Sequence, residues 1–89
     1  MQTKSLPEIE DVGVLTEEYD LVVHNDDVHT FDFVIETLID ICSHEYHQAV
    51  QCTYIIHHNG KCAVKRGGYE KLKPLCDSIR QKGLSATIE

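Results

Sequence analysis

The spacing of the apolar residues changes across a short polar stretch near the start of the chain, and this change limits the available folds. Apolar and polar side chains alternate from Tyr19 to His24 with one apolar slip, as in a half-buried strand. After Thr30, a good helix N-cap, apolar residues recur at helical spacing as far as Ser43. The sequence therefore predicts a strand and a helix joined by a loop that opens with Asn25-Asp26-Asp27.

This loop admits two interpretations. Asn and Asp favour turns because their side chains bond the nearby backbone, so the three residues are typical of a solvated turn. A buried structural loop rarely carries two adjacent acids, since an unpaired carboxylate in apolar surroundings costs several kcal/mol or becomes protonated. Asp26 and Asp27 therefore also form a candidate binding site.

The rest of the chain alternates between helical and strand-like patterns. Ser43 is placed to cap the start of a second helix, and Gly60 is placed to end it as a left-handed C-terminal residue. Pro74 restricts where regular hydrogen bonding can begin in a third helix, because proline belongs in a first turn, so the part of that helix after residue 73 is the best supported. The predicted elements are a helix over 44–58, a strand over 61–66, a turn at 67–68, a helix over 69–82 and a strand over 84–89. The order β-α-α-β-α-β indicates an α+β fold with helices on one face of a small sheet.

Length and charge limit the classes of function. A chain of 89 residues makes one domain without room for a separate cofactor domain. Residues 1–18 carry five acids and one lysine, which predicts a flexible acidic extension before a domain over residues 19–89. The net charge of −7 argues against nucleic-acid binding, which needs a basic surface. No apolar run of about 18 residues and no secretory signal is seen, so a cytoplasmic protein without a membrane span is expected.

The cysteines and histidines leave a metal site as an alternative. None of the four cysteines forms a C-x-x-C pair, and three lie in apolar periodic segments, as small buried hydrophobes do. His44 and His47 lie three residues apart, as ligands on one helix face do. Cys42 or Asp40 would be their third partner, but no further ligand has a set position, so no metal or other cofactor is expected. No cysteine has an identifiable orienting partner, which favours a binding module over an enzyme.

Three segments together resemble one protein family. They are NDDVHTFDFV at residues 25–34, IIHHNGK at residues 55–61 and LSATIE at residues 84–89. Over residues 19–89 the chain is similar to the ClpS family, adaptors that deliver N-degron substrates to Clp proteases. The resemblance implies an αβ sandwich of a three-stranded antiparallel sheet and three helices. It also implies a monomer whose partners are N-degron peptides and the N-terminal domain of a ClpA- or ClpC-type AAA+ unfoldase.

The resemblance further implies a polar rim beside a small apolar pocket. The rim holds the free α-amino group of a peptide, and the pocket takes a bulky first side chain such as Leu, Phe, Tyr or Trp. Asn25, Asp26, Asp27 and His57 form the amino-group site by position, with Asp26 supporting the peptide backbone or the loop. The same correspondence assigns the pocket to Phe31, Val34, Thr53, Ile56 and Leu84, and the rim to Val28 and His29.

Several positions depart from the family pattern. Phe31 stands where the family often has a methionine at the pocket mouth, and Thr53 where a large methionine often lines the wall, so the pocket is reshaped. His29 on the rim is expected to tune the response to pH. The segment before the last strand is shorter than usual, and Glu70 and Lys71 are assigned to the unfoldase contact by position.

The competing hypothesis is a small metal-binding or ribosome-associated protein-interaction domain. In such a domain the acidic loop is only a turn and His57 is only a helix cap. The two hypotheses differ in the direction of three side chains, because only the adaptor hypothesis requires Asn25, Asp27 and His57 to converge on one hollow.

Overall fold

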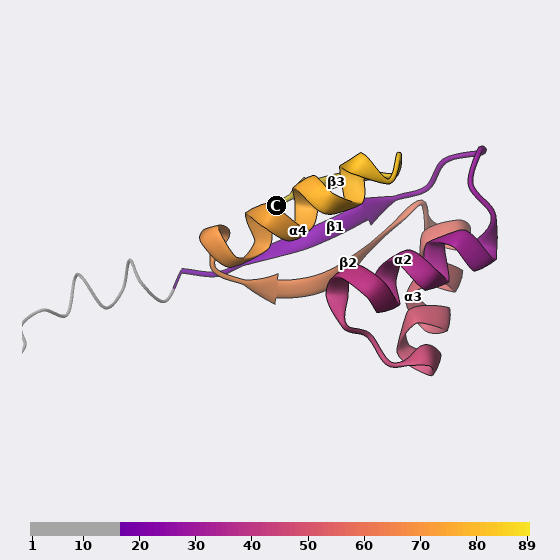
Figure 1. Ribbon diagram of the computed structural model, residues 1–89, viewed down its shortest axis with the longest axis horizontal. Coiled ribbons are helices and arrows are strands. Elements are labelled where there is room, and N and C mark those ends of the chain that lie inside the picture. Colours follow the sequence, from indigo (N-terminus) through magenta and orange to yellow (C-terminus); the bar gives the residue numbers. More distant parts are fainter. Residues whose placement is uncertain (1–16) are drawn as a thin grey trace, which may run out of the picture.

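Residues 17–89 fold into three strands and three helices that follow the predicted order (Figure 1). The computed structural model describes these residues, so most of the predicted acidic extension, residues 1–16, lies outside the described part. The elements are β1 (Tyr19–His24), α2 (Phe31–Cys42), α3 (Tyr46–Asn59), β2 (Lys61–Gly67), α4 (Tyr69–Gln81) and β3 (Ser85–Ile88). Each strand matches its predicted range to within one residue at either end, and the α+β class is confirmed.

Strand β1 is the central strand of the antiparallel sheet, whose order is β2-β1-β3. Leu21 and Val23 of this strand are fully buried in the hydrophobic core. The three helices contribute most of the other side chains of that core, among them Val34, Ile35 and Leu38 of α2, Ala49 and Ile56 of α3, and Leu72, Cys76 and Ile79 of α4. A single core therefore joins the sheet to these helices. Within residues 17–89, no helix has the length and apolar character needed to cross a membrane.

Helix α2 begins where the sequence predicts. The Oγ1 atom of Thr30 accepts a hydrogen bond from the Phe33 N–H at 3.1 Å, which satisfies one of the unpaired donors of the first turn. Asp32 lies in the same turn, where the positive end of the helix dipole favours an acid. The cap thus sets the residue at which the loop after β1 turns into helix.

The prediction for Ser43 is wrong. This residue does not cap the second helix but ends α2, with its backbone in the left-handed region at φ 59°. The following N–H, that of His44, donates to the Leu38 carbonyl at 3.4 Å and closes the end of α2. The chain needs two further residues before it can turn again, so α3 starts after Glu45 rather than at His44.

Helix α4 begins at Tyr69, as predicted from the sequence. Pro74 does not delay the start of the helix, because the first turn closes on Gly68, whose carbonyl accepts the Lys71 N–H at 3.1 Å. Pro74 then lies inside the helix. Its missing N–H would have paired with the carbonyl of Glu70, and the exposed position of that residue lets water bond the carbonyl instead.

Gly60 joins the end of α3 to the loop that follows β1. Its backbone is left-handed at φ 95°, as predicted, and its N–H donates to the Ile56 carbonyl at 3.0 Å. The Gly60 carbonyl accepts the N–H of Asn25 at 2.8 Å. This turn therefore holds the first residue of the polar loop next to the last turn of α3.

Replacing Gly60 by alanine should lower the free energy of unfolding by about 1 kcal/mol, because a Cβ atom is strained in left-handed backbone. The added methyl group would meet no atom within 4 Å, so the loss isolates the backbone contribution. Urea unfolding followed by circular dichroism measures the change. Gly60→Asn is the matched control and should lose less, since asparagine tolerates this conformation. Equal losses in the two variants would contradict this explanation.

Candidate functional site

Asp26 organises the polar loop through its own side chain. Its Oδ1 accepts the N–H groups of Val28 at 2.9 Å and His29 at 3.0 Å, and its Oδ2 lies 2.9 Å from Nδ1 of His29. The hydrogen bond from the His29 N–H is the main cause that lowers the pKa of Asp26 below its ordinary value, while partial burial acts in the opposite direction. Of the two adjacent acids, Asp26 is therefore committed to the loop, and the exposed Asp27 follows it in the chain.

His29 packs the loop between two helices. Its ring stacks on Phe33 of α2, with ring centroids 4.8 Å apart and an interplanar angle of 25°. On the other side it meets the turn after α4, where a Cβ atom added to Gly83 would come within 3.1 Å of the His29 Nε2 atom. The backbone of Gly83 is also left-handed, at φ 94°. Glycine suits this position because it has no Cβ atom to clash with His29 and because it adopts a positive φ without strain. The polar loop is thereby fixed in one place relative to α2.

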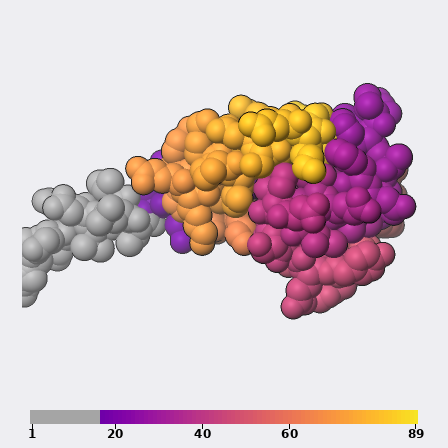
Figure 2. Space-filling model, viewed as in Figure 1, coloured from indigo at the N-terminus to yellow at the C-terminus, as the bar shows by residue number. Residues whose placement is uncertain are grey.

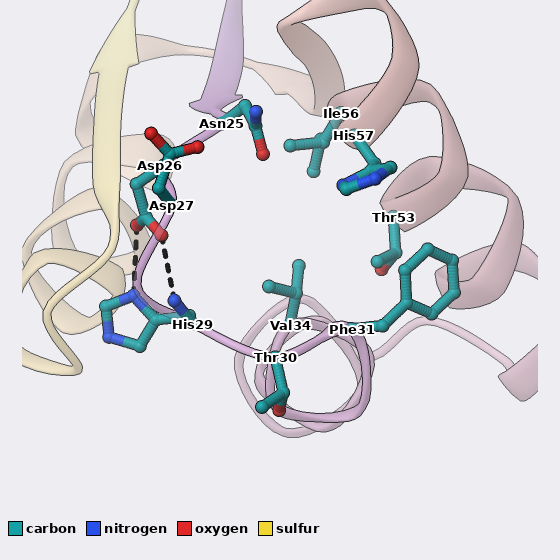
Figure 3. A pocket seen from close by; sticks show the side chains of 10 residues that line it. All are labelled: Asn25, Asp26, Asp27, His29, Thr30, Phe31, Val34, Thr53, Ile56 and His57. Carbon is teal, nitrogen blue, oxygen red and sulfur yellow. Dashed lines mark hydrogen bonds and ion pairs between the residues drawn. The ribbon is translucent and has the colours of Figure 1, made fainter.

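The loop, the start of α2 and the second half of α3 enclose a hollow of about 230 Å³ (Figure 3). The loop forms one end of the molecule, drawn in purple in Figure 2. The residues that line the hollow are Asn25, Asp26, Asp27, His29, Thr30, Phe31, Val34, Thr53, Ile56 and His57. Segments that are distant in the sequence therefore meet at one site.

Polar groups border this hollow, and apolar groups lie between them. The Asn25 carbonyl oxygen and the Asp27 carboxylate lie on one side, and the His57 ring faces them from the last turn of α3 (Figure 3). Val34 and Ile56, which are both buried, form the apolar part. The structure thus brings Asn25, Asp27 and His57 to the same hollow, an arrangement that a simple turn and a simple helix cap do not require.

The two positions that depart from the family pattern lie at the same hollow. Phe31 is 39% exposed, and its ring meets the His57 ring edge-on, with centroids 6.3 Å apart. Thr53 lies one turn before His57 on α3 and is buried in the wall. A flat aromatic ring and a small hydroxyl-bearing side chain therefore shape the two sides of the apolar slot.

The lining of the hollow differs from the prediction at Leu84 and Thr30. Leu84 does not line it, because the turn from α4 into β3 directs this side chain into the core, where it is 4% exposed. Val28, which was assigned to the rim, donates its backbone N–H to Asp26, and its side chain is 81% exposed at the loop. Thr30, which was not predicted as a site residue, does line the hollow. Its position directly before Phe31 in the sequence could have indicated this.

The metal alternative used His44 and His47. The Nε2 atom of His44 donates to the Val64 carbonyl at 2.7 Å, so this buried ring supports strand β2. His47 is largely exposed and lies 3.7 Å from Glu45. Across residues 17–89, no three His, Cys, Asp or Glu side chains gather in a way that would hold a metal ion.

Comparison with protein families matches residues 15–87 to the family described as ATP-dependent Clp protease adaptor protein ClpS. The match covers more than half of the chain. The chain belongs to the ClpS family. This family consists of adaptors and not of enzymes, in agreement with the binding module predicted from the sequence.

Curated members of the ClpS family are similar to this chain over a shorter stretch. The ATP-dependent Clp protease adapter protein ClpS of Campylobacter jejuni subsp. jejuni is 48% identical over 42 residues, which are 47% of this chain and 44% of that protein. ClpS of Clostridium acetobutylicum is 43% identical over 42 residues, which are 47% of this chain and 42% of that protein. The match therefore spans less than half the length of these relatives.

A solved structure shows that the fold is shared. It is the structure of Agrobacterium tumefaciens ClpS2 bound to L-phenylalaninamide, which is similar to this chain with a TM-score of 0.71 and 21% sequence identity. The similarity covers 83% of this chain and 96% of that chain. The three-stranded sheet with three helices is thus the ClpS fold.

Because its pKa is lowered in the folded state, Asp26 should stabilise the fold at neutral pH and not in acid. The contribution is present above the ordinary value of 3.8 and is lost as the pH falls through the lower value of the folded protein. Asp26→Asn removes the charge, so the difference in free energy of unfolding between wild type and variant should shrink as the pH falls from about 6 to about 2. Urea unfolding at several pH values measures it.

Asp40→Asn is the control for this prediction, since it removes one negative charge from an exposed position of α2. It should not reproduce the pH dependence seen with Asp26→Asn. A difference between wild type and Asp26→Asn that stays constant over the whole pH range would contradict the role of Asp26.

Proposed function

We propose that the protein is an adaptor that binds N-degron substrates by their free α-amino group and bulky hydrophobic first side chain, and delivers them to a Clp AAA+ unfoldase with its protease. One observation carries this proposal. The exposed polar groups of Asn25, Asp27 and His57 border a hollow whose apolar part is formed by buried side chains such as Val34 and Ile56. Membership of the ClpS family supports the same role.

The polar border matches the hydrogen-bonding needs of a primary ammonium group. Such a group has three N–H donors, which require three acceptors when water is removed. The Asn25 carbonyl, the Asp27 carboxylate and a ring nitrogen of His57 supply these acceptors, and the carboxylate also compensates the positive charge. The imidazole of His57 must be neutral for its ring nitrogen to accept. Asp26 contributes indirectly, because its hydrogen bonds set the loop that presents Asp27.

The apolar part supplies the second half of the recognition. Burial of a Leu or Phe side chain contributes about 1.5–3 kcal/mol, whereas micromolar affinity needs about 8 kcal/mol. Neither half is sufficient alone, so a ligand must carry both a free amine and a bulky apolar side chain. L-phenylalaninamide, to which the Agrobacterium tumefaciens ClpS2 structure is bound, is a small molecule with both groups, which supports this interpretation.

Acetylation of the peptide amine should weaken binding at least about tenfold, which corresponds to about 1.4 kcal/mol, because it removes the charge and two donors facing Asp27. The measurement is a fluorescence titration of the protein with two peptides that begin with Leu and differ only in the blocked amine. The Asp27→Asn variant should show a smaller difference between the two peptides than the wild type. Equal affinity of the wild type for both peptides would refute the proposed function.

We place the unfoldase contact on the first turn of α4. Glu70 and Lys71, assigned to this contact by position, are exposed there, at the end of the molecule opposite the polar loop (Figure 1). A monomer in the cytoplasm would then bind its peptide and a ClpA- or ClpC-type unfoldase through separate surfaces. The acidic extension over residues 1–18 would assist the transfer of the substrate.

Exchange of the two charges, Glu70→Lys with Lys71→Glu, should weaken binding to the N-terminal domain of the unfoldase severalfold and leave peptide affinity unchanged. The exchange keeps the net charge, so any loss of unfoldase binding reports on the position of the charges. Surface-immobilised ClpA- and ClpC-type N-terminal domains measure the first quantity, and peptide titration measures the second. Wild-type affinity of the double variant for both domains would contradict this assignment.

A further inference from the structure

Thr53 carries an unpaired hydroxyl group in the wall of the hollow. The residue is 2% exposed, and its Oγ1 atom has no hydrogen-bond partner among the described residues. Only one other buried side-chain atom in residues 17–89, Nδ1 of His44, is in the same condition. Because buried hydroxyl groups are normally paired, this exception calls for a physical explanation.

A threonine in a helix usually has a partner close by. Thr37, which is equally buried in α2, donates its hydroxyl to the Phe33 carbonyl one turn earlier, at 2.9 Å. Thr53 occupies the same kind of position in α3 and does not make this bond. Its hydroxyl therefore keeps both its donor and its acceptor capacity for a group that comes from outside the chain.

The surroundings of Thr53 indicate what such a group would be. Thr53 lies between the His57 ring of the polar border and the Phe31 ring, on the side of the hollow where Phe31 and Val34 supply apolar surface (Figure 3). Phe31 packs edge-on against His57, one turn further along α3, and its ring is half-exposed. A ligand side chain that enters the slot and tilts this ring would meet the Thr53 hydroxyl without having to remove water from it.

We propose that Thr53 is a specificity-determining residue that hydrogen-bonds the phenol of a first-position tyrosine, so that the protein prefers Tyr over Phe. The inference rests on the proposed function, because it assigns the slot to the first side chain of a peptide. Tyrosine carries an O–H at the far end of an otherwise apolar ring. Phenylalanine fills the same space but offers no partner to the Thr53 hydroxyl, so it gains no hydrogen bond there.

The test compares two peptides that differ only in Tyr or Phe at the first position. Each is titrated against the wild type, Thr53→Val and Thr53→Ser. The valine variant has nearly the same shape without the hydroxyl, and the serine variant retains it. The preference for Tyr over Phe should be about three- to tenfold for the wild type and the serine variant, and should disappear in the valine variant.

Thr37→Val is the matched control, because it removes a buried threonine hydroxyl that does not line the slot and that already has a partner. It should keep the wild-type preference for Tyr, and it should lower the midpoint of urea unfolding more than Thr53→Val does. The same ratio of Tyr to Phe affinity in the wild type and in Thr53→Val would overturn the role of Thr53 and leave the proposed function standing. Failure of the wild type to bind either peptide would overturn both.

Discussion

One backbone hydrogen bond, from the N–H of Asn25 to the carbonyl of Gly60 at 2.8 Å, fixes the two halves of the site relative to each other. It continues the antiparallel pairing of β1 with β2, in which His24 lies opposite Lys61. The loop after β1 and the last turn of α3 are therefore held side by side. Because the polar border takes groups from both segments, recognition of a ligand by this hollow depends on that pairing.

The two neighbouring acids of the loop are in different environments. Asp26 uses both of its carboxylate oxygens for hydrogen bonds to backbone and imidazole groups of the loop. Asp27 remains exposed at the border of the hollow, where a carboxylate can meet a cationic ligand. Under the proposed function the two acids have separate roles, because Asp26 is occupied by the loop and Asp27 has a carboxylate available to a ligand.

The hollow has a solvent-exposed polar border and a buried apolar wall. Its border is open to water, which keeps Asp27 and His57 solvated when no ligand is present. Its walls come from buried side chains that also belong to the core, such as Val34 and Ile56, so the apolar slot cannot easily change shape. Thr53 departs from this division, because it is a polar group placed among the apolar walls.

The sequence by itself determined the parts of this protein that depend on near neighbours. The alternation in β1, the cap at Thr30 and the left-handed Gly60 follow from local chemistry, and the family motifs identified the residues at the border of the hollow. Only the tertiary structure decided that Leu84 packs in the core, that the His29 ring meets the turn at Gly83, and that the Thr53 hydroxyl is buried without a partner. Each of these depends on which distant or neighbouring group the folded backbone places within reach, and spacing along the chain does not encode those distances.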